Sequence, residues 1–581
     1  MSKETSVKNL KPLPIGTASY KEAVMDCYCV DKTLLIRDIL DKKVKVYLIT
    51  RPRRFGKTFN MSMLQTFFEN SGEDKSVYFK DKKIWKCGPE YTDKMGAYPV
   101  ISISFKDARG NNWEECYNEI TKVLSAEFKK RIKIADNPKL DASDREKFIA
   151  IKEGLAQGSD YRDSLMWLTE LMQSTCKKCP IILIDEYDTP IQAGYLYGYY
   201  DKVIDFIRPF FSKALKDNAN IAFAVLTGIN RVSKESIFSG LNNLKTYSIL
   251  DDTFSEYFGF TRDEVRDMFD YYGYSGMYGT ACAWYDGYRF GRSGIFNPWS
   301  IINYIDDGAS SEPKDYWINT SGNDIIYDLL KGATPEVLNN LIALLQGENI
   351  VAMIDENLTY PELKGDVTNA YSLLLMSGYL KTVDSQFCSM PDGILMGLSQ
   401  RHNYCLAIPN EEVKDAFYFF IKKLISSFCA KEPDGKLFIE IWDAIMARDA
   451  DAVTASLHGF LSSTASYFDT AYESFYQGFM LSVCAYKWGS YLIHTQEPSG
   501  LGRYDIELEP RGQNLPGIII EVESVTRSKS QNAGPLEKRA RAGLEQIKAK
   551  GYNRNLLSRG IKDIILVGIA FNADEVSAVI E

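Results

Sequence analysis

The sequence predicts an α/β protein built on a doubly wound parallel sheet, followed by a predominantly helical middle region and a smaller C-terminal α/β unit. Three observations carry this prediction. An alternating apolar run at 44–49 leads through Gly56-Lys57-Thr58 into apolar residues at helical spacing. A continuous apolar run at 181–184 ends in Asp185-Glu186, which is typical of a strand buried on both faces of a parallel sheet. Strands and helices alternate with short connections to about residue 250.

Length and charge limit the classes of protein that this chain can form. Its 581 residues are too many for one hydrophobic core, and roughly 150 residues per domain predicts three or four domains. The formal net charge is −9, so the surface as a whole does not attract nucleic acid or an anionic membrane. A nucleic-acid site therefore has to be a local basic patch.

Membrane proteins and disulfide scaffolds are not indicated. No segment approaches the roughly 20 apolar residues of a transmembrane helix, and the stretch Met1–Thr5 has no apolar signal core. Eleven scattered cysteines favour reduced thiols. Cys176 and Cys179 have metal-ligand spacing, but no second pair follows, which argues against structural zinc. We expect a cytoplasmic protein.

The pattern divides the chain into four parts, namely 1–250, 251–330, 331–465 and 466–581. The first is the α/β core, and its remaining expected elements are a helix capped at Thr33, a strand at 98–105, helices through 112–175 and a strand at 221–227. The second is a small helical subdomain whose many aromatic residues are expected to be core. The third is helical. The fourth is expected to hold a helix at 472–486, strands at 491–495, 502–508 and 517–523, a helix containing Gln546, and a final strand at 563–570.

Gly56-Lys57-Thr58 lies where a strand turns into a helix, which is the setting of a phosphate-binding loop. Unpaired N–H groups at a helix N-terminus favour an anion. Lys57 can reach terminal phosphates, and the Thr58 hydroxyl can hold Mg²⁺. Arg51 stands where the motif has its first glycine, so a basic turn without a ligand remains the alternative. The candidate nucleotide-binding residues of the loop are Arg54, Phe55, Gly56, Lys57, Thr58 and Phe59.

Three acidic residues follow the apolar run at 181–184. Open α/β sheets bind ligands at the carboxyl ends of their strands. Asp185 is the candidate magnesium ligand and Glu186 the candidate base that orients or deprotonates water, with Asp188 two residues further on. Capping of the next helix is the alternative role for the pair.

The strand at 221–227 supplies further candidates at its tip. Thr227 and Asn230 are placed to sense the terminal phosphate, and Arg231 to counter charge in a transition state. A plain strand end explains each of them equally well.

Acidic residues also recur in the C-terminal part. Glu473, Asp505 and Glu521 can converge on one or two Mg²⁺ ions, because Mg²⁺ prefers oxygen ligands. Such a cluster would activate water against a phosphodiester. The stretch 527–562 holds ten Lys or Arg against two Glu, a patch suited to the phosphate backbone of DNA or RNA. A solvated, charged helix face is the alternative.

Six stretches, taken in order, resemble the predicted AAA-ATPase-like family of bacterial proteins, in which a P-loop NTPase core precedes a PD-(D/E)XK nuclease-like domain. The resemblance implies ATP and Mg²⁺ as cofactors, and an arginine in place of the first loop glycine is the family's own pattern. The stretches are Val30–Thr33, Thr50–Thr58, Leu183–Asp188, Phe238–Leu244, Trp284–Tyr288 and Asn297–Ser300.

The nuclease resemblance is looser and implies a restriction-endonuclease-like α/β domain. Its matching positions are Glu473, Asp505, Glu521, Gln546 and Tyr552. The motif's lysine, two residues after Glu521, is Glu523 here. Three outcomes remain open: a lysine has migrated, with Lys538 ahead of Lys529; the extra carboxylate alters metal binding; or the domain binds without cutting. We expect period-two alternation to put Glu521 and Glu523 on one face, opposite Asp505.

Taken together, the sequence predicts a magnesium-dependent ATPase with a nuclease-like C-terminal module that acts on nucleic acid. The alternative is a nucleotide-gated interaction protein whose C-terminal module is an inactive docking domain. Turnover of ATP separates the two.

Overall fold

The computed structural model describes fifteen stretches of the chain, within which it forms two compact units. The first unit consists of Met1–Ser321, Met353–Thr382 and Pro409–Glu412, and the second of Gly322–Ala352, Val383–Ile408 and Val413–Glu581. The predicted division into four parts is finer than this one and stays a prediction. The described residues are 10–138, 140–229, 242–317, 335–356, 359–364, 368–384, 403–428, 436–464, 473–487, 490–495, 498–499, 502–512, 514–524, 535–572 and 575–581.

A five-stranded parallel sheet forms the centre of the first unit, in the order β2-β3-β4-β1-β5. Every residue of β1, β3 and β4 is buried, as the apolar runs predict. Strand β4 separates the strand before the phosphate loop from the strand that ends in Asp185. The strands are β1 (Val46–Thr50), β2 (Val100–Ser104), β3 (Ile181–Asp185), β4 (Ala224–Gly228) and β5 (Leu244–Tyr247).

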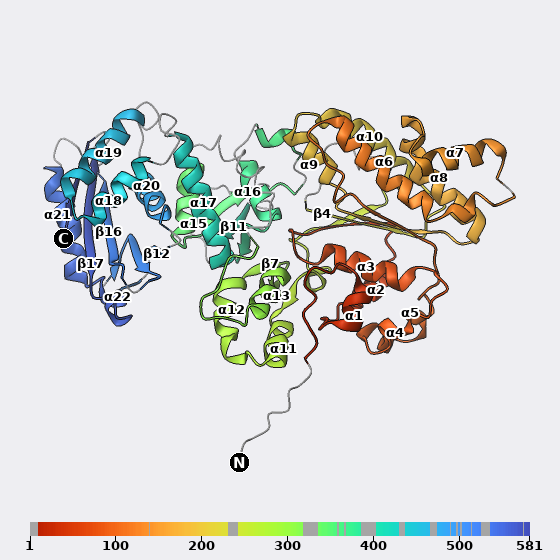
Figure 1. The fold of residues 1–581 in the computed structure, drawn as a ribbon, viewed down its shortest axis with the longest axis horizontal. Coiled ribbons are helices and arrows are strands. Elements are labelled where there is room, and N and C mark those ends of the chain that lie inside the picture. The colour runs from red at the N-terminus through yellow and green to blue at the C-terminus, as the bar shows by residue number, and fades with distance from the viewer. Residues whose placement is uncertain are drawn as a thin grey trace, which may run out of the picture. The chain divides into compact units, whose positions relative to one another are not determined.

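Helices cover both faces of this sheet, which confirms the doubly wound α/β prediction. Helices α1 to α3 lie on one face, and α6, α8 and α10 on the other (Figure 1). The helical elements here are α1 (Tyr20–Asp26), α2 (Leu34–Lys42), α3 (Lys57–Phe68), α4 (Ser76–Phe79), η1 (Lys83–Cys87), α5 (Pro89–Thr92), α6 (Trp113–Lys129), η2 (Ile132–Ile134), α7 (Ala142–Glu153), α8 (Gly158–Cys176), α9 (Thr189–Leu196) and α10 (Tyr200–Leu215).

The aromatic subdomain after residue 251 is not wholly helical, contrary to the prediction. It adds a three-stranded antiparallel sheet in the order β6-β8-β7, whose strands of two to four residues are too short to show a period in the sequence. Phe269, Tyr285, Phe296 and Tyr304 are buried in one cluster, so the prediction that the aromatics form core is confirmed. The elements are η3 (Ser255–Tyr257), β6 (Phe260–Thr261), α11 (Arg262–Tyr272), η4 (Ser275–Met277), α12 (Tyr278–Tyr285), β7 (Tyr288–Phe290), β8 (Ser293–Phe296) and α13 (Pro298–Asp306).

In its described residues, the stretch predicted to be helical at 331–465 contains three short strands among its helices. The strands are β9 (Ile350–Met353), β10 (Lys381–Val383) and β11 (Asn403–Ala407). The helical elements are α15 (Pro335–Leu345), η6 (Pro361–Lys364), α16 (Thr368–Met376), α17 (Glu411–Phe428), α18 (Lys436–Met446) and α19 (Ala450–Thr464).

The C-terminal part contains a mixed five-stranded sheet in the order β12-β15-β16-β17-β18. Only β16 and β17 pair in parallel. Gly568 of β17 faces α21, and Phe571 of the same strand stacks on Tyr476 of α20, so helices cover both faces. The elements are α20 (Glu473–Ala485), β12 (Tyr491–Thr495), β13 (Pro498–Ser499), β14 (Gly502–Arg503), β15 (Ile506–Pro510), β16 (Gly517–Ser524), α21 (Leu536–Lys550), α22 (Arg554–Ser558), β17 (Ile564–Asn572) and β18 (Glu575–Ile580).

Two predictions about these strands are wrong. The strand predicted at 502–508 is divided by a bend at Asp505 into β14 and β15. The strand at 563–570 is not the last one, because β18 pairs antiparallel with β17 at the sheet edge, where its short alternating sequence gives a weak signal. The first error concerns an interruption of two residues, Tyr504 and Asp505, which period-two reasoning cannot see.

Two further features bear on the class of protein. In the described part of the chain, no helix is long and apolar enough to cross a membrane. Eight described cysteines are free, whereas Cys405 is disulfide-bonded, so the expectation of reduced thiols does not hold at that position.

Candidate functional sites

The phosphate loop joins β1 to α3 through two residues in the left-handed region, Arg54 at φ 67° and Gly56 at φ 80°. The ammonium of Lys57 is almost completely buried inside this turn. It donates hydrogen bonds to the carbonyl oxygens of Arg51 at 3.2 Å and Pro52 at 3.0 Å. The predicted strand-to-helix setting is thus confirmed, with the lysine held at the centre of the loop.

Asp185 receives two hydroxyl groups from different elements. Thr58 at the start of α3 donates to its Oδ2 at 2.6 Å, and Thr227 at the end of β4 donates to its Oδ1 at 2.6 Å. Burial, followed by the neighbouring charge of Glu186, raises the pKa of Asp185, while the two hydroxyls and Lys57 oppose that rise. The structure therefore brings together the two predicted magnesium ligands and the predicted phosphate sensor, because β4 lies between β1 and β3.

Glu186 follows β3 with a backbone in the left-handed region, at φ 52°. Such a conformation costs a glutamate about 1–3 kcal/mol and is found mainly where function requires it. The carboxylate Oε1 lies 3.4 Å from Lys57 Nζ and is partly exposed. The strained backbone thus turns the predicted base toward the phosphate loop.

Arg51 explains how the loop does without its first glycine. The side chain is fully buried, and its guanidinium donates to the carbonyl oxygens of Thr50 at 2.7 Å and Tyr247 at 3.0 Å. It also lies 5.3 Å from the ring centres of both Phe258 and Phe290. These contacts hold the Arg51 side chain within the protein and anchor the loop to the aromatic subdomain.

The other loop residues differ in whether their side chains pack against the protein or are available to a nucleotide. The Phe55 ring is buried edge-on against Tyr288, with ring centres 4.9 Å apart, so only its backbone remains available. Phe59 packs edge-on against Tyr20 at 5.7 Å. Arg54 is exposed.

Asp188 fixes the start of the segment that follows β4. Its Oδ2 accepts a hydrogen bond from the N–H of Ile229 at 2.9 Å. A Cβ on Gly228 would lie 2.6 Å from Asp188 Oδ1, so glycine is needed for this approach. The predicted residues Asn230 and Arg231 lie outside the described residues.

The second acid group lies in the C-terminal sheet, where Asp505 is nearly buried. Its Oδ2 accepts the N–H of Val522 at 2.8 Å, and its Oδ1 accepts the Nε2 amide of Gln477 at 3.1 Å. Gln477 itself accepts the Nε2 amide of Gln346 at 2.8 Å. The sequence missed both glutamines, although Gln477 lies one helical turn after Glu473, a spacing that predicts a shared face.

Glu521 is the most perturbed carboxylate of this group. Burial, and then the charge of Asp505, raise its pKa, with Glu523 adding to the rise and the Gln546 side chain opposing it. Its Oε1 is buried without a hydrogen-bond partner among the described residues. A Cβ on Gly543 of α21 would contact the side chains of both Glu521 and Glu523, which confirms that they share a face.

Of the two lysines predicted to complete the nuclease motif, only Lys538 is among the described residues, and it does not lie at these acids. Lys538 is exposed on α21, five residues from Gly543, which amounts to about 140° around the helix. It therefore lies on a different side from Glu521. Lys529 and the side chain of Glu473 lie outside the described residues, and the rest holds no group of three His, Cys, Asp or Glu arranged to bind a metal.

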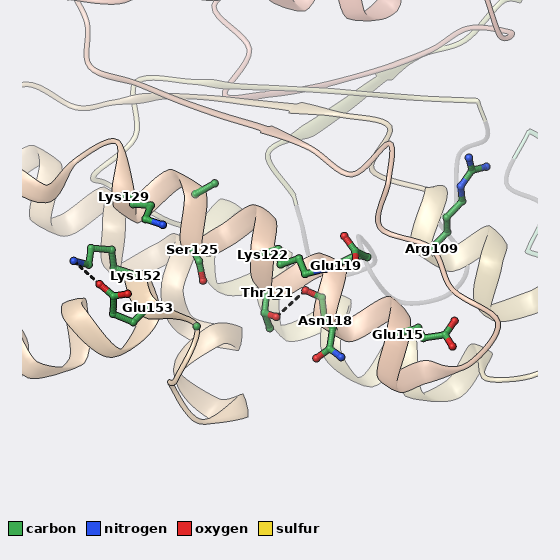
Figure 2. Close-up of a pocket in the computed structure, with 12 residues that line it drawn as sticks. Arg109, Glu115, Asn118, Glu119, Thr121, Lys122, Ser125, Lys129, Lys152 and Glu153 are labelled. Carbon is green, nitrogen blue, oxygen red and sulfur yellow. Dashed lines mark hydrogen bonds and ion pairs between the residues drawn. The ribbon is translucent and has the colours of Figure 1, made fainter.

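A groove of about 630 Å³ lies elsewhere, between α6 and the end of α7. Its rim is charged and internally paired: Lys152 forms an ion pair with Glu153 at 2.6 Å, and Thr121 donates to the Asn118 carbonyl at 2.9 Å (Figure 2). None of the predicted site residues lines it. The groove is a solvated surface feature.

The fold and the first site together define a P-loop NTPase domain. Residues 14–238 match the family model described as a predicted AAA-ATPase, and residues 471–581 match that of the PD-(D/E)XK nuclease superfamily. The chain thus combines an AAA-ATPase-like domain with a PD-(D/E)XK nuclease-like domain, which confirms the resemblance seen in the sequence.

One curated relative spans nearly the whole chain. It is an uncharacterized protein in the vnfD 5′ region of Azotobacter chroococcum mcd 1, 24% identical over 584 residues that cover 98% of each chain. Two solved structures also match weakly. A signal transduction ATPase with numerous domains from Pyrococcus horikoshii has a TM-score of 0.21 at 12% identity, covering 76% of this chain and 54% of that one. The Aeropyrum pernix ORC2 protein, solved with ADPNP and ADP, has a TM-score of 0.23 at 8% identity, covering 73% and 96%.

Proposed function

We propose that this protein binds ATP and hydrolyses it with Mg²⁺, and that its C-terminal module acts on nucleic acid in the cytoplasm. The observation that carries the ATPase proposal is the network of Thr58, Asp185 and Thr227 beside Lys57 and Glu186. One hydroxyl and one carboxylate 2.6 Å apart are oxygen ligands of the kind Mg²⁺ prefers. The donor set therefore fits a nucleotide-bound magnesium ion.

Each residue has a separate task in this proposal. Lys57 exchanges its bonds to the loop carbonyls for the terminal phosphates, which removes the cation that now faces Glu186. Glu186 then accepts a proton from the attacking water or orients it. Thr227 keeps Asp185 in place from the neighbouring strand, so that the metal ligand does not rotate. Arg54 and the N–H groups at the start of α3 add positive potential around the phosphates.

Replacing Lys57 tests the nucleotide site. Lys57→Ala should lower ATP affinity at least about 100-fold and abolish turnover, because a buried cation that faces the phosphates is lost. Lys86→Ala, on the exposed side of η1, is the matched control and should change neither. Binding by calorimetry and phosphate release are the measurements. A Lys57→Ala protein that still hydrolyses ATP would refute this role.

Nucleic acid is the proposed partner of the C-terminal module, through the basic stretch 527–562. Lys538, Arg554 and Lys562 are exposed in its described part. If Z phosphates are contacted on duplex DNA, log affinity should fall with log salt concentration at a slope of about −0.9Z. Fluorescence anisotropy at several salt concentrations measures this slope.

Glu523 in place of the motif lysine favours a second candidate function, a nucleotide-gated interaction protein whose nuclease-like domain docks without cutting. Asp505 and Glu521 still offer a fit for a divalent cation, because Glu521 Oε1 is an orphaned buried acceptor among the described residues. DNA binding that is absent at low salt, together with slow or absent ATP turnover, would support this second function over the first.

A further inference from the structure

Two tryptophans of the aromatic subdomain hold two consecutive residues of the phosphate loop. The Trp317 indole N–H donates to the carbonyl oxygen of Arg53 at 3.2 Å. The Arg54 guanidinium lies 4.0 Å from the centre of the Trp299 ring. Arg54 is one of the two left-handed residues of the loop. This turn of the loop is thus contacted from the aromatic subdomain, outside the sheet.

Glu412 joins the segments that carry these tryptophans. It is completely buried, although it is a glutamate. Its Oε2 accepts the Ser300 hydroxyl at 2.7 Å, one residue after Trp299. Its Oε1 accepts the backbone N–H groups of Tyr316 at 2.7 Å and Trp317 at 2.6 Å. One carboxylate therefore fixes the neighbours of both rings.

Further contacts connect the two tryptophan segments to each other and to the phosphate loop. The Trp299 indole N–H donates to the carbonyl oxygen of Tyr316 at 3.1 Å, which ties the two tryptophan segments to each other. The Trp317 ring packs on Tyr379 at 4.8 Å between ring centres. Tyr288 contacts Trp317 on one side and Phe55 of the loop on the other, at 6.3 and 4.9 Å. Removal of the Glu412 carboxylate would therefore disturb the phosphate loop through several of these contacts.

We propose that Glu412 is a positioning residue of the nucleotide site, which presses Trp299 and Trp317 onto the phosphate loop and preshapes it for a nucleoside triphosphate. The inference rests on the proposed nucleotide binding. Glu412 is also the second residue of α17. A displacement of this first helical turn would loosen the loop, and by linkage a bound nucleotide would stabilise the turn in return.

The chemistry of Glu412 indicates an informative set of variants. Gln at this position keeps one oxygen for the two backbone N–H groups, and its amide can donate to the Ser300 hydroxyl. Ala keeps none of the three bonds. Glu411 is the exposed neighbour on the same turn, so Glu411→Ala is the matched control. Trp317→Phe removes the indole N–H and one of the two fused rings, and keeps an aromatic ring between Tyr288 and Tyr379.

The test is calorimetric binding of a nonhydrolysable ATP analogue with Mg²⁺. Glu412→Ala should bind about tenfold more weakly and Trp317→Phe about threefold more weakly, while Glu412→Gln and Glu411→Ala stay within about twofold of the parent. Rescue by Gln separates positioning from a requirement for charge. If Glu412→Ala does not fold, Trp317→Phe decides.

Two results would overturn the inference in distinguishable ways. Folded Glu412→Ala and Trp317→Phe proteins that bind the analogue like the parent would refute the positioning role alone. A parent that does not bind the analogue would refute the proposed nucleotide site, and the positioning role with it.

Discussion

Asp185 and Glu521 are buried carboxylates on strands of the two sheets, and each has at least one other carboxylate as its neighbour. Their surroundings differ in charge. Asp185 has Lys57 close by and two hydroxyl donors, which oppose the rise of its pKa. Glu521 has Asp505 and Glu523 nearby, and the opposing group is the neutral amide of Gln546. The first site holds one cation, Lys57, beside its two carboxylates, whereas the described part of the second holds none and requires a bound cation or proton.

This difference shows that two similar clusters of carboxylates can suit different binding events, namely that of a phosphate in the first site and that of a cation in the second. In the first site, we propose that an incoming phosphate draws Lys57 away from Glu186 and leaves the carboxylate free to act as a base. In the second, three neighbouring carboxylates repel one another unless a divalent ion or a proton neutralises them. No group in the described part of that site supplies the polarising cation that a nuclease lysine provides.

A lysine beside the acids of the second site would give both sites a cation. Of the substitutions that we predict, this one should have the largest effect on activity. Glu523→Lys should raise Mg²⁺- or Mn²⁺-dependent cleavage of plasmid DNA at least about 10²-fold over the parent, because the lysine relieves repulsion and helps activate water. Glu545→Lys, on the exposed face of α21, adds the same charge away from the acids.

The control decides what a gain of cleavage means. Equal gains in Glu523→Lys and Glu545→Lys would point to stronger DNA binding rather than to a repaired site. Robust cleavage by the parent that survives Asp505→Ala would contradict the assignment of this site altogether.

Glu412 is a third buried carboxylate, and the groups that donate hydrogen bonds to it are neutral. It therefore shows how burial changes the pKa of a carboxyl group without strong repulsion from other carboxylates. Burial raises its pKa from 4.5 to about 7, and Asp315 adds a smaller rise; the other titratable groups that sense its charge are Tyr285, Tyr288 and Tyr316. Between these two pKa values the folded protein binds more protons than the unfolded chain. Stability should therefore fall as pH rises from 4.5 to 7, by at most about 3 kcal/mol.

Glu412→Gln mimics the protonated form and should lack this loss of stability. Its thermal midpoint relative to the parent should rise by a few degrees between pH 5 and pH 8. Differential scanning calorimetry across that range makes the comparison, with Glu411→Gln as the control. A constant difference between variant and parent would show that the Glu412 carboxyl does not titrate in this range.

The sequence was sufficient for the parallel sheet, the phosphate loop and the choice of Thr58, Asp185 and Thr227 as candidates, because each depends on local pattern. The hydrogen bonds that join these three residues follow from the strand order, which the sequence did not predict. It could not predict the role of Arg51, since a buried guanidinium looks the same in sequence as one that binds phosphate. Glu412 and Gln346 were missed for a different reason. Both act across 95 to 131 residues of chain, and no local spacing records such contacts.

At the nuclease-like site, the sequence predicted the shared face of the acids but not the position of a lysine. Alternation correctly placed Glu521 and Glu523 on one face, yet it gave no means of choosing between Lys529 and Lys538. Helical phase, once the bounds of α21 are known, turns Lys538 away from the acids. Gln477 could have been found from its distance of four residues to Glu473.

The central claim is that the first site turns over ATP through Glu186, and comparing the parent with Glu186→Gln tests it most directly. Both proteins are assayed for binding of a nonhydrolysable ATP analogue and for Mg²⁺-dependent phosphate release. We predict that binding stays within about twofold while turnover falls about 10²-fold or more, because an amide cannot accept a proton from water. Turnover by Glu186→Gln at the rate of the parent would contradict the account.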